Sequence, residues 1–343
     1  MTNRLRSTLK AALLCELLAL VFFRFPVIAG ETYINPVLEE TVIVRHASPE
    51  GDSFQEAVHT LGIGDPAVLL HKGTYYMYPT GDNRGYDVYT SHDLVHWKKG
   101  PRVFRSEEKG VWAPDVFYNS EDNTFYLYYT VNRRVGAAVS KSPEGPFTDK
   151  GTIVTGAIDA HMFLDDDGRY YLYYAKFPEF RIYVQPMKAP LQKSGDAVMI
   201  IHPDQQWEMR HVALTEAPWM VKHNGIYYLL YSGSAANTLD YAIGYGTAKS
   251  PAGPFEKYHG NPVMKKGNGV FGPGHCSLTR DSKGKLWMVY HQQRNASKGW
   301  DRIICVDPVW FDEKGVLHVQ ATRGVRQPAP APFPEQTDKE IGP

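Results

Sequence analysis

The chain has 343 residues, of which 37 are basic and 37 acidic, so its formal net charge is zero. Apolar residues make up 43% and charged residues 22%, which is typical of a folded globular protein and excludes wholesale disorder. The balanced charge gives no electrostatic basis for binding nucleic acid. Aromatic residues reach 13%, many of them in short tyrosine runs, and the predicted fold has to explain this excess.

Residues 1–29 have the pattern of a cleavable signal peptide. Basic residues precede an apolar stretch, Ala11–Phe23, which is shorter than a membrane span, and small residues up to Ala29 offer a cleavage site. We therefore expect a secreted or periplasmic protein with no membrane association beyond this segment. An uncleaved membrane anchor is the alternative.

A block recurs five times along the rest of the chain: a short apolar strand, a tight turn and an aromatic strand. Four of the five turns carry Asn-Gly, Asp-Gly or Lys-Gly, which predicts hairpins because such turns need positive φ. Repeats of about 40–50 residues with about four strands each are typical of propeller blades. We predict an all-β fold, a single five-bladed β-propeller over residues 30–326. A β-sandwich with repetitive hairpins is the alternative.

The Pro-rich segment 327–343 is predicted to be an extended strap or disordered. Beyond the signal segment the chain has two cysteines, Cys276 and Cys305, which is too few for a disulfide framework. Whether these two pair stays open, because an oxidising compartment would permit it. Stability therefore has to come from a hydrophobic core, and the sequence does not indicate an oligomeric state.

In a propeller the first strand of each blade lines the central channel, so residues at the block starts converge on one funnel. These start residues are Asp65, Asp115, Asp159, Glu216 and His275. Each acid alone has a structural interpretation, because an Asp before a turn commonly caps it. Asp115 lies three residues deeper in its block and is predicted to be structural. The coincidence of the other three acids indicates a catalytic site.

At these positions the sequence resembles glycoside hydrolase family 43, with matches from about residue 60 to about residue 320. The matching motifs are Gly64–Val68, Val111–Val116, Ile158–Asp159, Asp165–Gly168, Thr215–Trp219 and Gly272–Ser277. Members of this family are five-bladed propellers that act mainly on β-xylosides, α-L-arabinofuranosides, arabinan and, in some branches, β-1,3-galactan. The resemblance implies an inverting O-glycosyl hydrolase that removes xylose or arabinofuranose from plant-type polysaccharides such as xylan and from oligosaccharides.

By position, the resemblance implies that Asp65 is the general base, Glu216 the general acid and Asp159 a third carboxylate that orients the acid. Inversion needs one carboxylate to activate water and one protonated carboxyl to protonate the leaving oxygen. An unperturbed Glu titrates near pH ~4.3, so the acid needs a raised pKa. We expect the negative charge of Asp159 to raise the pKa of Glu216.

The resemblance also suggests further site residues. His275 becomes a channel residue that either ligates a structural calcium ion, partly through water, or hydrogen-bonds to a catalytic carboxylate; calcium prefers oxygen ligands. Arg302 is expected to bind sugar hydroxyls, unless it is a surface residue on a strand. Trp112 and, more weakly, Tyr231 are candidates for an apolar wall against the sugar. Asp159 is followed by Ala160-His161, whereas proline is common at this point in the family. His161 therefore either lines the funnel or is a core histidine.

A long charged segment, Glu39–Gly64, precedes the first block and is expected to cap the funnel and to favour terminal sugars. Retaining fructan-hydrolase propellers are one alternative, but their motifs match poorly at Asp65-Pro66-Ala67 and at Glu216-Ala217. A non-catalytic carbohydrate-binding propeller is the other alternative, and the three acids at the funnel argue against it.

Overall fold

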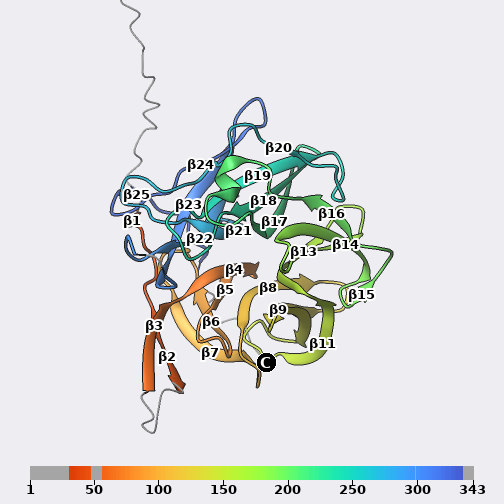
Figure 1. The fold of residues 1–343 in the computed structure, drawn as a ribbon, viewed down its shortest axis with the longest axis horizontal. Helices are drawn as coiled ribbons and strands as arrows, with labels where there is room; N and C mark the ends of the chain where they lie inside the picture. Colours follow the sequence, from red (N-terminus) through yellow and green to blue (C-terminus); the bar gives the residue numbers. More distant parts are fainter. Residues whose placement is uncertain (1–30, 48–55, 298, 335–343) are drawn as a thin grey trace, which may run out of the picture. The chain divides into compact units, whose positions relative to one another are not determined.

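The repeated hairpins fold into five antiparallel sheets of consecutive strands arranged around a central axis (Figure 1). The computed structural model describes residues 31–47, 56–297 and 299–334. The chain divides into two units, residues 1–31 and residues 32–343, and all the sheets belong to the second unit. The prediction of an all-β, five-bladed propeller is confirmed, and the sandwich alternative is wrong. Both the predicted signal segment and the end of the Pro-rich segment lie outside the described residues.

Each sheet is one blade. Blade 1 contains β4 (Gly64–His71), β5 (Thr74–Thr80), β6 (Gly85–Ser91) and β7 (Lys98–Arg105). Blade 2 contains β8 (Val111–Asn119), β9 (Thr124–Val131), β10 (Arg134–Ser140) and β11 (Thr148–Thr155). Blade 3 contains β12 (Ala157–Leu164), β13 (Tyr170–Lys176), β14 (Arg181–Ala189), β15 (Gln192–Lys193) and β16 (Val198–Ile201). Blade 4 contains β17 (Thr215–His223), β18 (Ile226–Gly233), β19 (Ala242–Ala248) and β20 (Glu256–Lys257). Blade 5 contains β21 (Gly274–Arg280), β22 (Leu286–Gln293), β23 (Arg302–Phe311) and β24 (Leu317–Val319).

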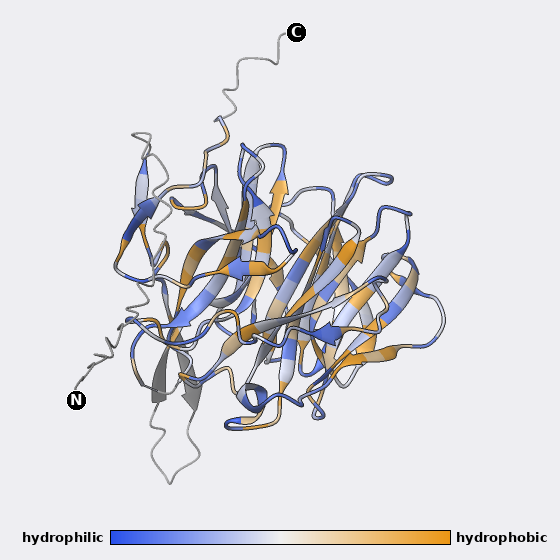
Figure 2. Cartoon of the chain, turned by 90° about the horizontal axis from the view of Figure 1, so that it is seen from above, coloured by the Kyte–Doolittle hydropathy of each residue, from blue (hydrophilic) through white to orange (hydrophobic). Residues whose placement is uncertain are grey.

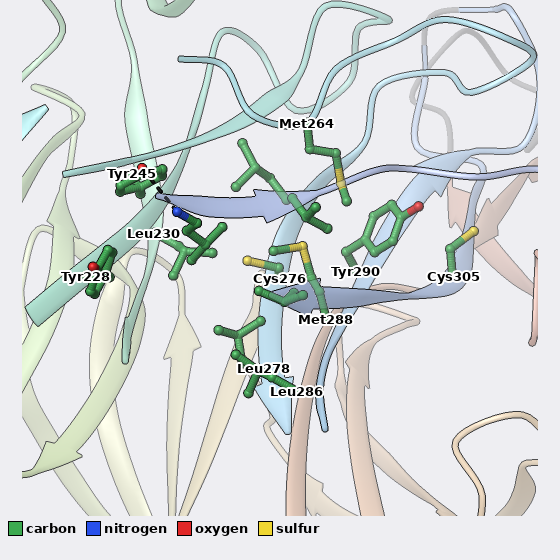
Figure 3. Close-up of a cluster of buried hydrophobic side chains, with 14 of the residues drawn as sticks. Tyr228, Leu230, Tyr245, Met264, Cys276, Leu278, Leu286, Met288, Tyr290 and Cys305 are labelled. Carbon is green, nitrogen blue, oxygen red and sulfur yellow. Dashed lines mark hydrogen bonds between the residues drawn. The ribbon is translucent and has the colours of Figure 1, made fainter. Parts of the chain in front are cut away.

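The aromatic excess packs the blades against one another. Within the described residues, each of five buried apolar clusters joins two neighbouring blades. Figure 3 shows the cluster between blades 4 and 5, which contains both Cys276 and Cys305 as free, buried thiols. Figure 2 shows how apolar and hydrophilic residues alternate along the strands, as expected when two faces of a sheet meet different surroundings.

Tyrosine hydroxyls in this core bond to the next blade. The second-strand residues Tyr78, Tyr128 and Tyr173 donate to backbone carbonyls of the following blade, at Pro143, Pro190 and Pro251, over 2.6–2.8 Å. A buried tyrosine needs such a partner, because an unpaired hydroxyl in an apolar core is costly. Repeated tyrosines therefore serve both as apolar filling and as fixed links around the ring.

Both ends of the described unit fasten onto blade 5. β1 (Thr32–Ile34) pairs with β25 (Arg326–Pro328), and Asn35 bonds to the backbone of Val306. The buried carboxylate of Asp307 accepts hydrogen bonds from Asn35, Tyr290, Thr322 and Gln327. This carboxylate therefore ties the beginning and the end of the unit to the same strand.

The Pro-rich segment continues from blade 5 to blade 1. The Ala331 amide donates to Asp281 of blade 5, and the Phe333 amide donates to the His92 carbonyl of blade 1. The Phe333 ring packs edge-on against Tyr75, with centroids 5.7 Å apart. The described part of this segment therefore spans the seam between the first and last blades.

The charged segment before blade 1 contains a hairpin, β2 (Thr41–Ala47) and β3 (Glu56–Gly62). The Gly62 amide at its base donates to the Trp300 carbonyl, which joins the hairpin to a loop of blade 5. The short 3-10 helix Gln206–Met209 lies in the loop before β17. Among the described residues no helix has the length and apolar character needed to span a bilayer.

Candidate active site

The first strand of every blade carries a β-bulge near its start. Pairing with the second strand skips two residues in each blade. The first skipped residue always has positive φ: Asp65 (49°), Ala113 (40°), Asp159 (58°), Ala217 (53°) and His275 (47°). Positive φ is uncommon for residues other than glycine, and bulges next to active sites redirect side chains. Because the bulge occurs at the equivalent place in all five blades, it is a regular feature of this propeller.

Only some of the predicted start residues occupy the bulge position. Asp65, Asp159 and His275 do, whereas Glu216 immediately precedes the bulge of its blade. Asp115 lies two residues after the bulge residue of blade 2, and its carboxylate accepts hydrogen bonds from the Met162 amide and His161. The structural role predicted for Asp115 agrees with these contacts, which join blades 2 and 3.

The backbone amide of each bulge residue donates to a side chain of the preceding blade. Hydroxyl groups of Thr80, Thr130 and Ser232 accept three of these bonds. The other two acceptors are a carboxylate oxygen of Asp159, for the Ala217 amide, and a ring nitrogen of His291, for the Asp65 amide. A closed ring of side-chain acceptors thus holds the strained backbone around the channel.

A cavity of about 790 Å³ opens at these bulges. It is lined by six of the residues predicted from the sequence: Asp65, Trp112, Asp159, Glu216, His275 and Arg302. The three carboxyl side chains are buried, with relative exposures of 6–8%. The structure therefore brings the three acids to one pocket, as the repeat pattern predicts, together with the arginine and the tryptophan that the family resemblance suggested.

Asp65 is held ionised by its neighbours. Burial alone would raise its pKa, but the positive charge of Arg302, followed by that of His275, lowers the pKa well below its usual range. Arg302 Nη1 lies 2.7 Å from Asp65 Oδ1. This contact requires glycine at position 64, because a Cβ there would lie 2.3 Å from Arg302 Cζ. An ionised carboxylate in this pocket can accept a proton from water.

Glu216 is in the opposite electrostatic state. Burial raises its pKa to about 7, the hydroxyl of Tyr241 lowers it, and the negative charge of Asp65 raises it further. The direction agrees with the sequence prediction, and burial is the largest cause of the shift. Glu216 and Asp159 also interact, because the charge of Glu216 raises the pKa of Asp159. A protonated carboxyl in this pocket can donate a proton to a leaving oxygen.

Asp159 acts on Glu216 through the backbone. Burial raises the pKa of Asp159 to about 8; His275 lowers it, and the charges of Glu216 and Asp65 raise it. Its Oδ2 accepts the amide of Ala217, the residue next to the acid, over 3.1 Å. Asp159 therefore fixes the position of the acid's main chain in blade 4.

Trp112 has a fixed orientation at the cavity. Its indole N–H donates to Asn83 Oδ1 over 2.9 Å, and its carbonyl accepts the hydroxyl of Tyr86. Sequence reasoning missed further apolar lining residues, which are Leu61, Phe177, Phe180, Val212, Leu214 and Trp300. They come from loops and from the charged segment, outside the repeated blocks, so no repeat pattern pointed to them.

His161 and Tyr231 do not line the cavity. His161 is buried between blades 3 and 4, where its ring stacks on Trp219 with centroids 4.2 Å apart. Tyr231 is fully buried and donates its hydroxyl to Glu208. The structure therefore gives both residues packing contacts in place of the substrate contacts considered for them.

The surroundings of His275 bear on the calcium hypothesis. Its Nδ1 lies 3.4 Å from Asp65 Oδ1 and 3.9 Å from Asp159 Oδ2. Within the described part of the chain, no group of three or more His, Cys, Asp or Glu side chains is placed to hold a metal ion. An imidazole turned toward two carboxylates is not the oxygen-rich shell that calcium prefers. A calcium ion that His275 holds partly through water therefore stays a prediction, and no catalytic step is assigned to a metal.

Comparison with known proteins agrees with this geometry. The model of glycosyl hydrolases family 43 matches residues 54–317. A β-D-galactofuranosidase, xynD, of Aspergillus niger is 30% identical over 75% of this chain and 82% of its own length. A xylosidase/arabinosidase of Bacteroides ovatus is 28% identical over 74% of this chain and 93% of its own. A thermostable family-43 glycoside hydrolase of known structure has 37% identity and a TM-score of 0.73, covering 83% of this chain and 99% of its own. The chain belongs to glycosyl hydrolase family 43 and is an O-glycosyl hydrolase.

Proposed function

We propose that the enzyme hydrolyses glycosides with inversion, with Asp65 as general base and Glu216 as general acid. The supporting observation is that two carboxyls in one cavity have opposite pKa shifts, lowered for Asp65 and raised to about 7 for Glu216. Asp65 takes a proton from the attacking water, and the water oxygen bonds to the anomeric carbon. The glycosidic bond breaks as Glu216 protonates the departing oxygen.

The remaining residues of the pocket have supporting roles in this reaction. Arg302 keeps Asp65 ionised and is available to sugar hydroxyls, because both line the cavity. Trp112 presents an apolar surface on which the C–H groups of a sugar ring can pack. Asp159 holds the backbone beside Glu216, and its burial, together with the charge of Asp65, favours its own protonated form.

We further propose xylose or arabinofuranose as the sugar that is released. Relatives named as xylosidase/arabinosidase, at 27% and 28% identity, support this choice. Galactofuranose is a second candidate, because the Aspergillus niger relative at 30% identity is named a β-D-galactofuranosidase. Secretion or export to the periplasm, directed by residues 1–29, is proposed from the sequence pattern.

A panel of aryl glycosides tests both the sugar and the catalytic residues. The panel contains β-xyloside, α-L-arabinofuranoside, β-galactofuranoside and β-galactoside, each with the wild type and with Glu216→Gln and Asp65→Asn. We expect turnover on a pentoside or furanoside, and a fall of about 10²–10⁴-fold in Asp65→Asn. A fall of the same size is expected in Glu216→Gln for aryl groups that need protonation to leave. Wild-type turnover by a correctly folded variant would refute the assignment of that residue.

A further inference from the structure

Glu216 has one fixed hydrogen-bond partner that the sequence did not reveal. The hydroxyl of Tyr241, the residue just before β19, donates to Glu216 Oε1 over 2.8 Å. Tyr241 is fully buried, and its ring lies directly against Gly274 of blade 5. A Cβ at position 274 would approach ring atoms Cδ1 and Cε1 to 2.0 Å. The absence of a side chain at Gly274 therefore makes room for the tyrosine that reaches the acid.

His291 stands in the corresponding relation to Asp65. It lies on β22, is fully buried, and its Nδ1 accepts the Asp65 amide over 3.1 Å and lies 3.3 Å from Asp65 Oδ1. Since Nδ1 is an acceptor, the neutral ring carries its proton on Nε2, which has no hydrogen-bond partner among the described residues. A buried N–H without a partner costs free energy. At three of the other bulges a hydroxyl accepts the backbone amide instead, so no imidazole N–H is buried there.

The two rings also lie against each other. Tyr241 and His291 are stacked with centroids 5.6 Å apart and an interplanar angle of 9°. One ring bonds to the acid and the other to the backbone of the base, and each comes from a different blade. A displacement of either ring therefore changes the placement of both catalytic carboxyls.

We propose that Tyr241 and His291 form a positioning pair for the two catalytic carboxyls, in which Tyr241 determines which oxygen of Glu216 carries the proton. The proposal rests on the roles of Asp65 and Glu216 given above. Because Tyr241 donates to Oε1, that oxygen is the unprotonated one, and the acidic proton sits on Oε2. When Oε2 gives its proton to the leaving oxygen, the same hydroxyl stabilises the new carboxylate.

The variant Tyr241→Phe tests this role, because it keeps the ring and removes only the hydroxyl. A hydrogen bond to a charged group is worth about 1.5–3 kcal/mol, so we expect kcat/KM for an alkyl glycoside to fall by about 10–100-fold. For a dinitrophenyl glycoside, whose leaving group departs without protonation, we expect a loss of less than about threefold. The alkaline limb of the pH profile should move to higher pH, because the hydrogen bond from Tyr241 that lowers the pKa of Glu216 is gone.

The matched control is Tyr227→Phe. Tyr227 is also buried and donates to a buried carboxylate, Asp165, over 2.6 Å, but neither residue lines the cavity. We expect this variant to keep the wild-type pH profile and the wild-type ratio of alkyl to dinitrophenyl turnover. That ratio does not depend on the fraction of folded enzyme, so a loss of stability in either variant leaves the test valid.

Two variants at His291 test the second half of the pair. His291→Asn keeps an acceptor near the Asp65 amide, and His291→Leu removes it. We expect His291→Leu to lower kcat equally for both leaving groups, since it disturbs the base, and His291→Asn to restore part of the loss. Equal losses on both leaving groups in Tyr241→Phe, with an unmoved alkaline limb, would overturn the proposal. Wild-type turnover of the alkyl glycoside by Glu216→Gln would instead refute the proposed function.

Discussion

Replacing Glu216 by glutamine should make the folded protein more stable at alkaline pH, although it lowers turnover of substrates whose leaving group needs protonation. The wild-type carboxyl is buried with a pKa of about 7, raised from its ordinary value of 4.5. Below pH ~4.5 the folded and unfolded states both hold the proton, so the variant gains nothing there. As the pH rises toward 7, the unfolded chain ionises first, and the wild type loses stability that the variant keeps.

The size of the effect follows from the pKa shift. A shift from 4.5 to about 7 corresponds to roughly 3 kcal/mol at about 1.36 kcal/mol per pH unit, reached in full only above pH ~7. Glutamine preserves the side-chain shape and still offers an oxygen to the hydroxyl of Tyr241. We therefore expect a gain of about 2–3 kcal/mol between pH 5 and pH 9, and little gain at pH 4.

Thermal or urea unfolding of both proteins at pH 4, 5, 7 and 9 measures this gain. An increase in melting temperature of several degrees at pH 9 is expected for a protein of this size. Glu313→Gln is the control, because Glu313 is exposed and its charge is solvated in both states. A gain that is the same at pH 5 and pH 9 would show that Glu216 is not held protonated in the folded protein.

Further predictions concern the surroundings of the base and the closure of the ring. Arg302→Gln should raise the pKa of Asp65 and move the acid limb of kcat/KM to higher pH, seen in the pH profile. Gly64→Ala should displace the guanidinium of Arg302 and lower kcat/KM by about tenfold or more, while Tm falls by only a few degrees. Asp307→Ala should cost about 3 kcal/mol in denaturant melts, because several buried donors lose their acceptor. EDTA tests the calcium hypothesis for His275: a lower Tm or a lower activity would support a bound ion, and no change in either would argue against it.

The sequence predicts the blades well because each repeats the same local chemistry. Tyrosine runs and Gly-containing turns recur, and the acids Asp65, Asp159 and Glu216 stand near the start of three repeats, within one residue of the bulge position. The bulge geometry was not predictable, because its positive φ falls on residues other than glycine. It also explains why Asp115, which follows the bulge of blade 2, does not line the cavity and instead accepts the Met162 amide of blade 3.

The partners of the catalytic carboxyls were missed for a different reason. Tyr241 and His291 lie among tyrosine-rich strands, where nothing in the sequence separates them from residues that pack blades together. Their role depends on contacts between neighbouring blades and on the space left by Gly274. Likewise, Phe177, Phe180 and Trp300 come from loops, and only the folded chain brings them to the cavity.

The stereochemistry of hydrolysis tests the central claim most directly. Proton NMR, recorded in the first minutes of turnover of an aryl glycoside, resolves the anomer of the released sugar before it mutarotates. With Asp65 activating water and Glu216 protonating the leaving oxygen in one step, the first sugar formed has the anomeric configuration opposite to that of the substrate. Release of a sugar with the retained configuration would contradict the account, because it would require one carboxylate to attack the sugar as a nucleophile.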